Sequence, residues 1–340
     1  MPHTKLVVKI TVREARFVRD GLPFRGAAGE ASPYNPPVRR LVGECPVPSS
    51  SAVSGSSGSG QARPGTTAAL VKREIITPSI GRFTFKLQLQ PRQQPLKMWK
   101  AGQHVTLDFS GELDNGWSHM RDDDPQSLND DFVRTFTVSK PPPVGEDEVV
   151  HDGVEVEITA RKHGPVTGLL WKYHIRVGLE IPVLGFGGDE SFQIAKADKS
   201  RRAVFVAGGV GITPLLAQAA GLLLAGGEGS DGSKNKGLVL LWSLRAGDLE
   251  LAVDTFERIQ GLAKVTRLFV TGDTSAAAVT ETVGKIEGLG AEAVVLGRMT
   301  QSDVSKEKGA KYYLCASVEM QALVQEWLQG EEVVSESFNY

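Results

Sequence analysis

Hydrophobic and polar residues alternate with period two along the middle of the chain. The alternation is clear in RFTFKLQLQ (82–90), HVTLDFS (104–110) and GVEVEITARK (153–162), and turn residues separate the three runs. Such alternation is typical of strands with one buried face. Several short strands at this spacing predict a small antiparallel β-barrel, which we place at residues 69–196. We expect the acidic segment 111–132 to be a long surface loop of that barrel.

The pattern changes after Arg201, where apolar runs of strand length alternate with longer helical patterns. Strands are predicted for RRAVFVAGG, KGLVLLWSLR, KVTRLFVTG and AKYYLCAS, and helices for TPLLAQAAGLLLAG, LELAVDTFERIQGL and VEMQALVQEWLQG. This alternation predicts a doubly wound parallel sheet at residues 197–340. The predicted fold class is therefore a six-stranded antiparallel barrel followed by an α/β domain.

The front of the chain fits neither pattern. Residues 1–45 predict one or two strands followed by a Pro/Gly-rich tail. They could be part of an upstream module, or an extra strand on the barrel. Residues 46–68 are rich in serine and glycine, and this composition predicts a flexible linker.

Composition excludes several classes of function. The 340-residue chain is 41% hydrophobic and carries a net charge of −2, which argues against nucleic acid and anionic membranes as partners. It has two cysteines and six scattered histidines, so we expect no metal site, iron–sulfur cluster or disulfide framework. The start, MPHTKLVVKITVRE, lacks the apolar run of a signal peptide, and we expect a cytoplasmic protein.

The stretch VFVAGGVGITPLLAQAAGLLLAGG (204–227) contains no charged side chain. Its length would suffice to cross a bilayer. Paired glycines and Pro214 in its middle argue against a membrane span and favour a strand, a glycine turn and a helix. Such a turn brings backbone N–H groups close to a phosphate at the helix N-terminus. A turn without a ligand stays open, because the spacing matches neither GxGxxG nor the Walker loop.

Four further stretches carry chemistry that suits a nucleotide. In RTFT (134–137), Arg134 can clamp a phosphate, Phe136 can stack on a ring, and Thr137 can bond a ring nitrogen. Alternation places Arg134 and Phe136 on one face and Thr137 on the other unless the strand bends. Taken alone, the stretch could also be an ordinary strand.

The other three stretches follow in order along the chain. HGPVTGLLW (163–171) predicts a turn at Gly164, with Thr167 capping a short helix as a second phosphate cradle. YYLCASVEM (312–320) ends a strand at Cys315, at the edge where open sheets bind ligands; a buried core cysteine is the alternative. VVSESFNY (333–340) ends the chain with the aromatic Phe338.

The ordered set of these motifs resembles the ferredoxin–NADP reductase superfamily over residues 69–340. The resemblance implies FAD or FMN in the barrel, with FAD the favoured of the two, and NADH or NADPH in the α/β domain. It implies that Thr137 and Cys315 lie at the reacting rings, with Cys315 as a positioning contact because no histidine adjoins it. The residues that the resemblance assigns to cofactor binding are Arg134, Phe136, Thr137, Gly164, Val166, Thr167, Gly208, Gly209, Gly211, Thr213, Pro214, Arg245, Cys315 and Phe338.

The resemblance implies an oxidoreductase that moves a hydride from NAD(P)H to flavin and then passes electrons to an external acceptor, a protein or a small molecule. An electron-relay or regulatory subunit with the same fold and little turnover is the alternative. Separately, Ala316 replaces the family's glycine after the cysteine, and its added Cβ is expected to slow hydride transfer or to alter the pocket. Gly272 and Asp273 stand where NADPH users carry Ser-Arg, which favours NADH, and Arg245 weakens that preference.

Overall fold

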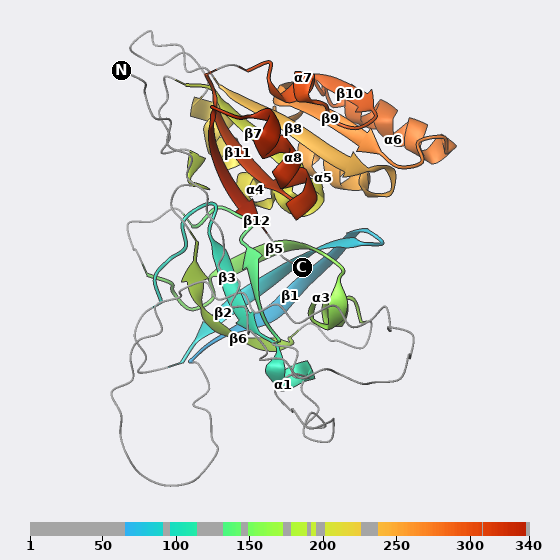
Figure 1. Ribbon diagram of the computed structural model, residues 1–340. Helices are drawn as coiled ribbons and strands as arrows, with labels where there is room; N and C mark the ends of the chain where they lie inside the picture. The colour runs from blue at the N-terminus through green and yellow to red at the C-terminus, as the bar shows by residue number, and fades with distance from the viewer. Residues whose placement is uncertain are drawn as a thin grey trace, which may run out of the picture.

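A computed structural model describes residues 65–90, 96–113, 132–143, 149–172, 178–188, 192–194, 201–225, 237–307 and 309–337. The predicted strands of 1–45 and most of the predicted linker lie outside these ranges. The described chain forms two halves, an antiparallel sheet and a parallel sheet (Figure 1). None of the helices in the described part of the chain has the length and hydrophobicity that a membrane crossing requires.

The antiparallel half contains six strands and two short helices. Its elements are β1 (Thr66–Thr77), β2 (Ile80–Leu89), β3 (His104–Asp108), α1 (Ser110–Leu113), β4 (Val133–Thr137), β5 (Glu155–Arg161), α3 (Gly164–Trp171) and β6 (Glu180–Gly187). The strand order is β4-β3-β6-β1-β2-β5. Strands β2, β3, β4 and β5 confirm the alternating patterns. Strand β1 starts at Thr66, so residues 66–68 belong to the sheet and not to the predicted linker.

The two outer strands of this sheet meet at one point. An isolated antiparallel bridge joins Val138, just after β4, to Ile158 in β5. Apart from this bridge, the ladder is not closed into a full barrel in the described residues. Alternate residues of the strands point inward into one core, which includes Phe83, Phe136 and Ile158. The residues between them therefore face outward.

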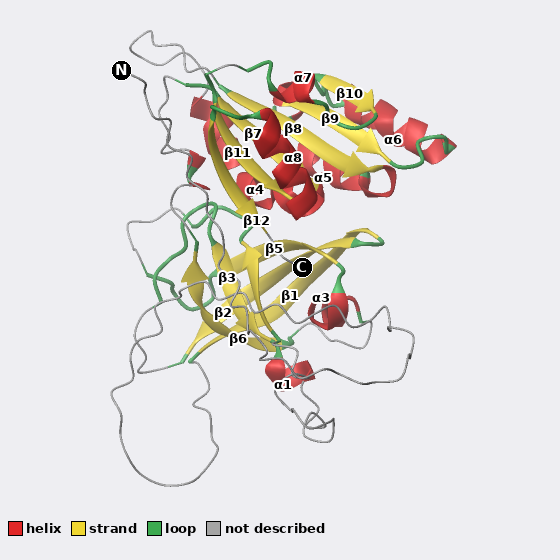
Figure 2. Ribbon diagram, viewed as in Figure 1, coloured by secondary structure: helices red, strands yellow, loops and turns green. Residues whose placement is uncertain are grey.

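The parallel half is a six-stranded sheet with helices on both faces (Figure 2). Its strands are β7 (Ala203–Gly208), β8 (Leu238–Arg245), β9 (Thr266–Thr271), β10 (Ala293–Leu296), β11 (Lys311–Ala316) and β12 (Glu332–Ser337). Its helices are α4 (Thr213–Ala225), α5 (Glu250–Arg258), α6 (Ala277–Gly288), α7 (Gln301–Val304) and α8 (Val318–Trp327), with 3-10 turns η4 (Gly209–Ile212), η5 (Ala246–Asp248) and η6 (Ala263–Val265). The doubly wound prediction is confirmed, although β10, β12, α6 and α7 were not predicted.

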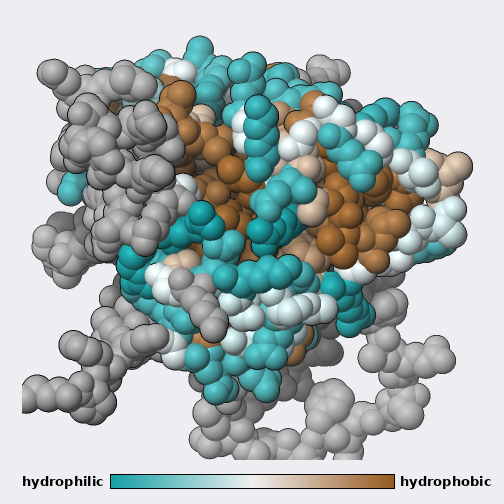
Figure 3. Space-filling model, turned by 90° about the horizontal axis from the view of Figure 1, so that it is seen from above, coloured by the Kyte–Doolittle hydropathy of each residue, from teal (hydrophilic) through white to brown (hydrophobic). Residues whose placement is uncertain are grey.

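The strand order β10-β9-β8-β7-β11-β12 reverses direction between β7 and β11. Ligands of open parallel sheets bind at such a switch point, beyond the carboxyl ends of the strands. Helices α4, α5 and α6 pack on one face, and α7 and α8 on the other. The outer strand β10 leaves Val295 and Leu296 exposed, and apolar areas are visible on the surface of this half (Figure 3).

Candidate active site

The predicted nucleotide turn lies at the switch point. Strand β7 ends at Gly208, the 3-10 turn η4 follows, and α4 begins at Thr213 with Pro214 in its first turn. Gly209 has a φ of +57°, a conformation that glycine adopts without strain. A Cβ at Gly211 would lie 2.1 Å from the carbonyl oxygen of Cys315. The turn therefore requires glycine at both positions, and it brings the ends of β7 and β11 into contact.

Cys315 is fully buried between two neighbouring strands, opposite Ala207 on β7 and Glu336 on β12. Burial raises the pKa of its thiol well above the usual value, and the Glu336 carboxylate raises it further. The thiol is therefore neutral near pH 7 and unsuited to nucleophilic attack. Full burial in the core of the parallel half matches the alternative of a core cysteine, and it leaves the thiol no exposed surface for direct contact with a ring.

Ala316, the departure from the family pattern, points into the core between the sheet and α8. A Cβ on Gly208 would lie 2.9 Å from the Ala316 methyl group and 3.1 Å from the sulfur of Met320. The extra methyl group is thus accommodated by the absence of a side chain at Gly208. Gln321, which the sequence analysis missed, donates from Nε2 to the carbonyls of Ala316 (2.9 Å) and Glu336 (2.7 Å). It ties together the ends of β11 and β12.

On β4, the side chains divide between two faces as predicted. Phe136 faces the core, where its ring packs edge-on against Phe109 with 6.3 Å between the ring centroids, and 9% of the residue is exposed. The Phe136 ring therefore has little free surface on which a cofactor ring could stack, as the prediction requires. Arg134 is half-buried and donates from Nη1 to the carbonyl of Val133 at 2.9 Å.

Thr137 lies on the outer face of β4. Its hydroxyl is buried and has no hydrogen-bond partner among the described residues. Directly opposite on β3 is His104, which in turn faces Gly187 on β6. Burial lowers the pKa of His104 to about 4, so its imidazole is neutral at pH 7. Sequence reasoning missed His104. It is the first residue of the predicted strand 104–110, but only the pairing of β3 with β4 shows that it lies opposite Thr137.

The second phosphate cradle differs from the prediction. Helix α3 begins at Gly164, and its N-cap is His163 instead of Thr167. The hydroxyl of Thr167 lies inside the first turn, where it accepts from the backbone N–H of His163 at 2.5 Å and donates to the His163 carbonyl. Pro165 lies in the first turn of the helix, a position that proline favours, so the helix begins at Gly164 and is capped by His163. Gly164 has a φ of +65° and open space where a Cβ would stand, while Val166 is buried beneath.

The outer face of the antiparallel half is the face that meets the parallel half. Arg161 on β5 bonds Asp248 of η5 at 2.6 Å and Ser79 at 2.9 Å. Its Nη2 atom lies 3.6 Å from the position of a Cβ at Gly209. Ser139, two residues beyond Thr137, accepts a bond from Thr159 on β5 at 3.2 Å. The structure thus connects the Thr137 strand, through β5, to the nucleotide turn.

The remaining predicted positions are Arg245 and Asp273, which lie at or just beyond the ends of two strands of the parallel sheet, and Phe338. Arg245 is exposed at the end of β8. On the neighbouring strand, Asp273 follows the end of β9, and hydrogen bonds from the side chain and then the backbone of Ser275 lower the pKa of Asp273. Phe338 lies outside the described residues.

Comparisons with known proteins identify the fold. No protein-family model and no curated protein sequence matches the chain. The flavohemoglobin-like FAD/NAD binding domain of nitric oxide dioxygenase from Vibrio cholerae O1 biovar El Tor matches with a TM-score of 0.53 at 17% identity, covering 81% of this chain and 99% of that chain. The flavohemoglobin from Malassezia yamatoensis with bound FAD and heme matches at 0.51 and 18%, covering 80% and 60%. A cytochrome P450 reductase from Amycolatopsis matches at 0.51 and 19%, covering 80% and 69%. The chain therefore has the two-domain fold of ferredoxin–NADP reductase-like flavin- and NAD-binding reductases.

Proposed function

We propose that the chain is a flavin-dependent oxidoreductase, in which the antiparallel half binds FAD and the parallel half binds a reduced nicotinamide nucleotide. One observation carries this proposal. The Thr137 hydroxyl is buried without a partner among the described residues, on the outer face of β4. An unsatisfied buried donor is costly, so such a group points to a ligand that supplies the missing acceptor. The ring nitrogen of a flavin is an acceptor of that kind.

A bound flavin would accept the hydride of the nicotinamide and would then pass the electrons to the external acceptor. The residues of this chain bind and orient the flavin. Thr137 would donate to the ring, and Arg134, on the other face of the same strand, would reach a phosphate around the edge of β4. The start of α3, where Gly164 is open to ligand, offers N–H groups for a second phosphate. Val166 and Thr167 lie beneath that turn and hold its backbone in place.

The nicotinamide nucleotide would bind across Gly208, Gly209 and Gly211. The first turn of α4, at Thr213 and Pro214, presents its positive end to the pyrophosphate. The nicotinamide would then lie over the ends of β7 and β11, with the neutral thiol of Cys315 buried beneath it as part of the packing that supports the turn. Because Ala316 packs against Gly208 in the core, its methyl group gives no support to the relay alternative without turnover.

We propose NADH as the preferred donor. Asp273 is exposed and ionised at neutral pH, and the bonds from Ser275 lower its pKa further. A carboxylate at the end of β9 repels the 2′-phosphate of NADPH. Arg245 at the end of β8 adds an opposing charge, so the expected discrimination is modest, about tenfold, equivalent to about 1.4 kcal/mol.

The electron acceptor lies outside this chain, a protein or a small molecule. The names of the matching structures include nitric oxide dioxygenase and a cytochrome P450 reductase, and both support transfer from a reductase of this fold to another centre.

The proposal is tested by flavin binding to the purified chain. Protein stripped of flavin is titrated with FAD, FMN and riboflavin, and bound flavin is followed by fluorescence. We expect FAD to bind most tightly, because two phosphate contacts are available. Equal affinities for FAD and riboflavin would contradict the assigned phosphate contacts, and no binding of any flavin would contradict the proposed function.

A further inference from the structure

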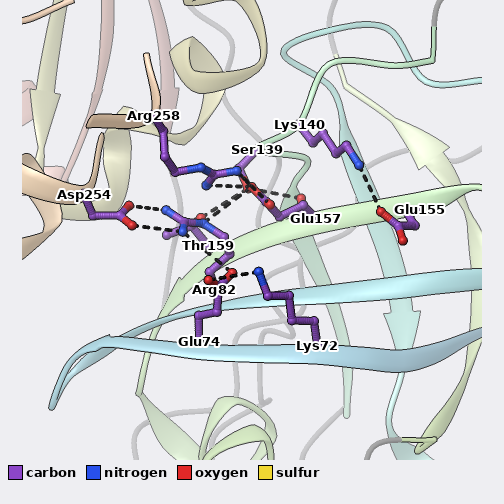
Figure 4. Close-up of polar contacts among 10 residues, drawn as sticks. All are labelled: Lys72, Glu74, Arg82, Ser139, Lys140, Glu155, Glu157, Thr159, Asp254 and Arg258. Carbon is purple, nitrogen blue, oxygen red and sulfur yellow. Dashed lines mark hydrogen bonds and ion pairs between the residues drawn. The ribbon is translucent and has the colours of Figure 1, made fainter. Parts of the chain in front are cut away.

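A group of charged residues joins the two halves outside the candidate site (Figure 4). Arg82 on β2 and Glu157 on β5 belong to the antiparallel half, and their side chains are 4% and 8% exposed. Asp254 and Arg258 belong to α5 of the parallel half. We call these four residues the interface cluster. Each acid in the cluster has an arginine partner from the opposite half.

The bonds of the interface cluster are directional. Arg82 donates from Nη1 to Asp254 Oδ1 at 3.1 Å, and its Nη2 bonds the other carboxylate oxygen. Arg258 donates from both terminal nitrogens to Glu157, with contacts of 3.0 to 3.2 Å. Two-pronged arginine–carboxylate pairs fix orientation as well as distance. Rotation of one half against the other would break both pairs.

The interface cluster also reaches the strand that carries Thr137. Glu157 accepts a bond from the Ser139 hydroxyl at 3.2 Å. Ser139 stands two residues beyond Thr137, so the two side chains share the outer face of that segment. Helix α5 of the nucleotide-binding half is therefore connected through one carboxylate to the backbone next to the proposed flavin contact.

The halves also meet through contacts outside the interface cluster. Ile80, at the start of β2, is fully buried within the core of the parallel half, and it already provides an apolar contact. Buried ion pairs give little net stability, because the cost of removing charges from water offsets their attraction. Their directional bonds, in contrast, select one arrangement of the two halves.

We propose that the interface cluster positions the parallel half so that a nicotinamide bound at Gly208–Thr213 meets a flavin bound beside Thr137. This inference rests on the proposed function. Arg82, Glu157, Asp254 and Arg258 are positioning residues, because none of them contacts the reacting rings. Misplacement of reacting groups by about 1 Å can slow a reaction about a hundredfold, so loss of the cluster slows flavin reduction.

The test compares two variants with a matched control. Asp254→Asn and Arg258→Gln each weaken one pair across the interface. Glu155→Gln is the control, because it breaks the Lys140–Glu155 pair of 3.0 Å, which lies within the antiparallel half on the same strand β5. Two measurements are made on every variant. Spin labels at the exposed positions Lys86 and Glu287, introduced with Cys45→Ser, report the distance between the halves in flavin-free protein by electron–electron double resonance. Stopped-flow absorbance reports flavin reduction at saturating NADH in protein without labels.

We expect Asp254→Asn and Arg258→Gln to broaden the distance distribution and to slow flavin reduction about tenfold or more, with FAD affinity unchanged. Glu155→Gln should match the parent protein in both measurements. Unchanged distances, or unchanged reduction rates in both variants, would overturn the inference. If NADH and NADPH both fail to reduce the flavin of the parent protein, the proposed function fails. The distances in flavin-free protein then still decide whether the cluster fixes the arrangement of the halves.

Discussion

At the scale of single residues, the hydroxyl of Thr137, which is buried and unpaired in the described part of the chain, predicts opposite effects on stability and on activity. Thr137→Val removes the hydroxyl and keeps the shape of the side chain. Because that hydroxyl has no partner in the flavin-free protein, we expect the variant to be more stable than the parent by about 1 kcal/mol. With flavin bound, the same change should slow reduction by NADH about five- to tenfold, the value of one hydrogen bond.

Thr167→Val is the matched control for the stability measurement. The Thr167 hydroxyl bonds both the N–H and the carbonyl of His163, so its loss should destabilise the protein by about 1 kcal/mol. Denaturant unfolding of the two variants measures the change in the free energy of unfolding, which should be positive for Thr137→Val and negative for Thr167→Val. A Thr137→Val protein that is less stable than the parent would mean that the hydroxyl already has a partner.

His104 predicts how stability depends on pH. Its pKa is about 4 in the folded protein, below its ordinary value of 6.5, so the unfolded chain binds the proton first as pH falls. The stability that neutral His104 contributes is fully present above pH 6.5 and is lost as pH falls towards 4. We expect the free energy of unfolding to fall by up to about 3 kcal/mol over this window. The His104→Gln variant should show a shallower slope, and equal slopes in the two proteins would contradict the assignment.

Cys315 predicts a lack of reactivity. Full burial and the raised pKa of its thiol leave almost no accessible thiolate. Alkylation of the Cys315 peptide at pH 8, followed by mass spectrometry, should be more than about tenfold slower in native protein than in protein unfolded by urea. Similar rates in the two states would show an open, reactive cysteine and would contradict the packing of η4 on β11.

Single residues differed in how far the sequence could predict them. Strand alternation correctly separated Phe136 from Thr137, because it depends on local geometry alone. Arg161 and Asp248 could not be predicted, since their pairing joins β5 to η5 across 87 positions of the chain. Thr167 was predicted to cap the helix but lies inside its first turn, because the helix starts at the Gly164–Pro165 pair and not after it.

At the scale of elements, the turn between β7 and α4 is the most constrained. Gly211→Ala would place a methyl group 2.1 Å from the Cys315 carbonyl oxygen, so backbone must move. We expect it to destabilise the protein by about 3 kcal/mol. Gly284→Ala in the exposed middle of α6 meets nothing within 4 Å and should stabilise it by about 1 kcal/mol. Thermal unfolding of both variants checks the contrast, and equal midpoints would contradict the packing of this turn.

Elements with a strong period were predictable, and those without one were not. Strands β2, β3 and β5 alternate clearly, and β7, β8 and β11 are continuous apolar runs of the kind buried in parallel sheets. Strand β10 spans four residues, and both of its last two side chains are exposed, so its sequence carries little periodicity. Strand β12 was not recognised because only its pairing with β11 shows that VVSES is extended.

At the scale of the whole molecule, the order of the motifs along the chain predicted the two-part fold. The contact between the two halves could not be predicted from the sequence. Composition and spacing do not reveal that Arg82 and Glu157 are covered by α5, because both read as polar positions of exposed strand faces. The outer face of the antiparallel sheet becomes buried only when the parallel half packs on it. That contact also places Arg161 of β5 beside Gly209 of the nucleotide turn.

The central claim is that one half presents a nicotinamide nucleotide to a flavin held by the other. The most direct measurement is the visible spectrum of the purified, FAD-loaded protein under nitrogen while NADH is added. The account predicts flavin absorbance that NADH bleaches at stoichiometric amounts, with NADPH acting more slowly. A flavin spectrum that neither nucleotide changes would contradict it.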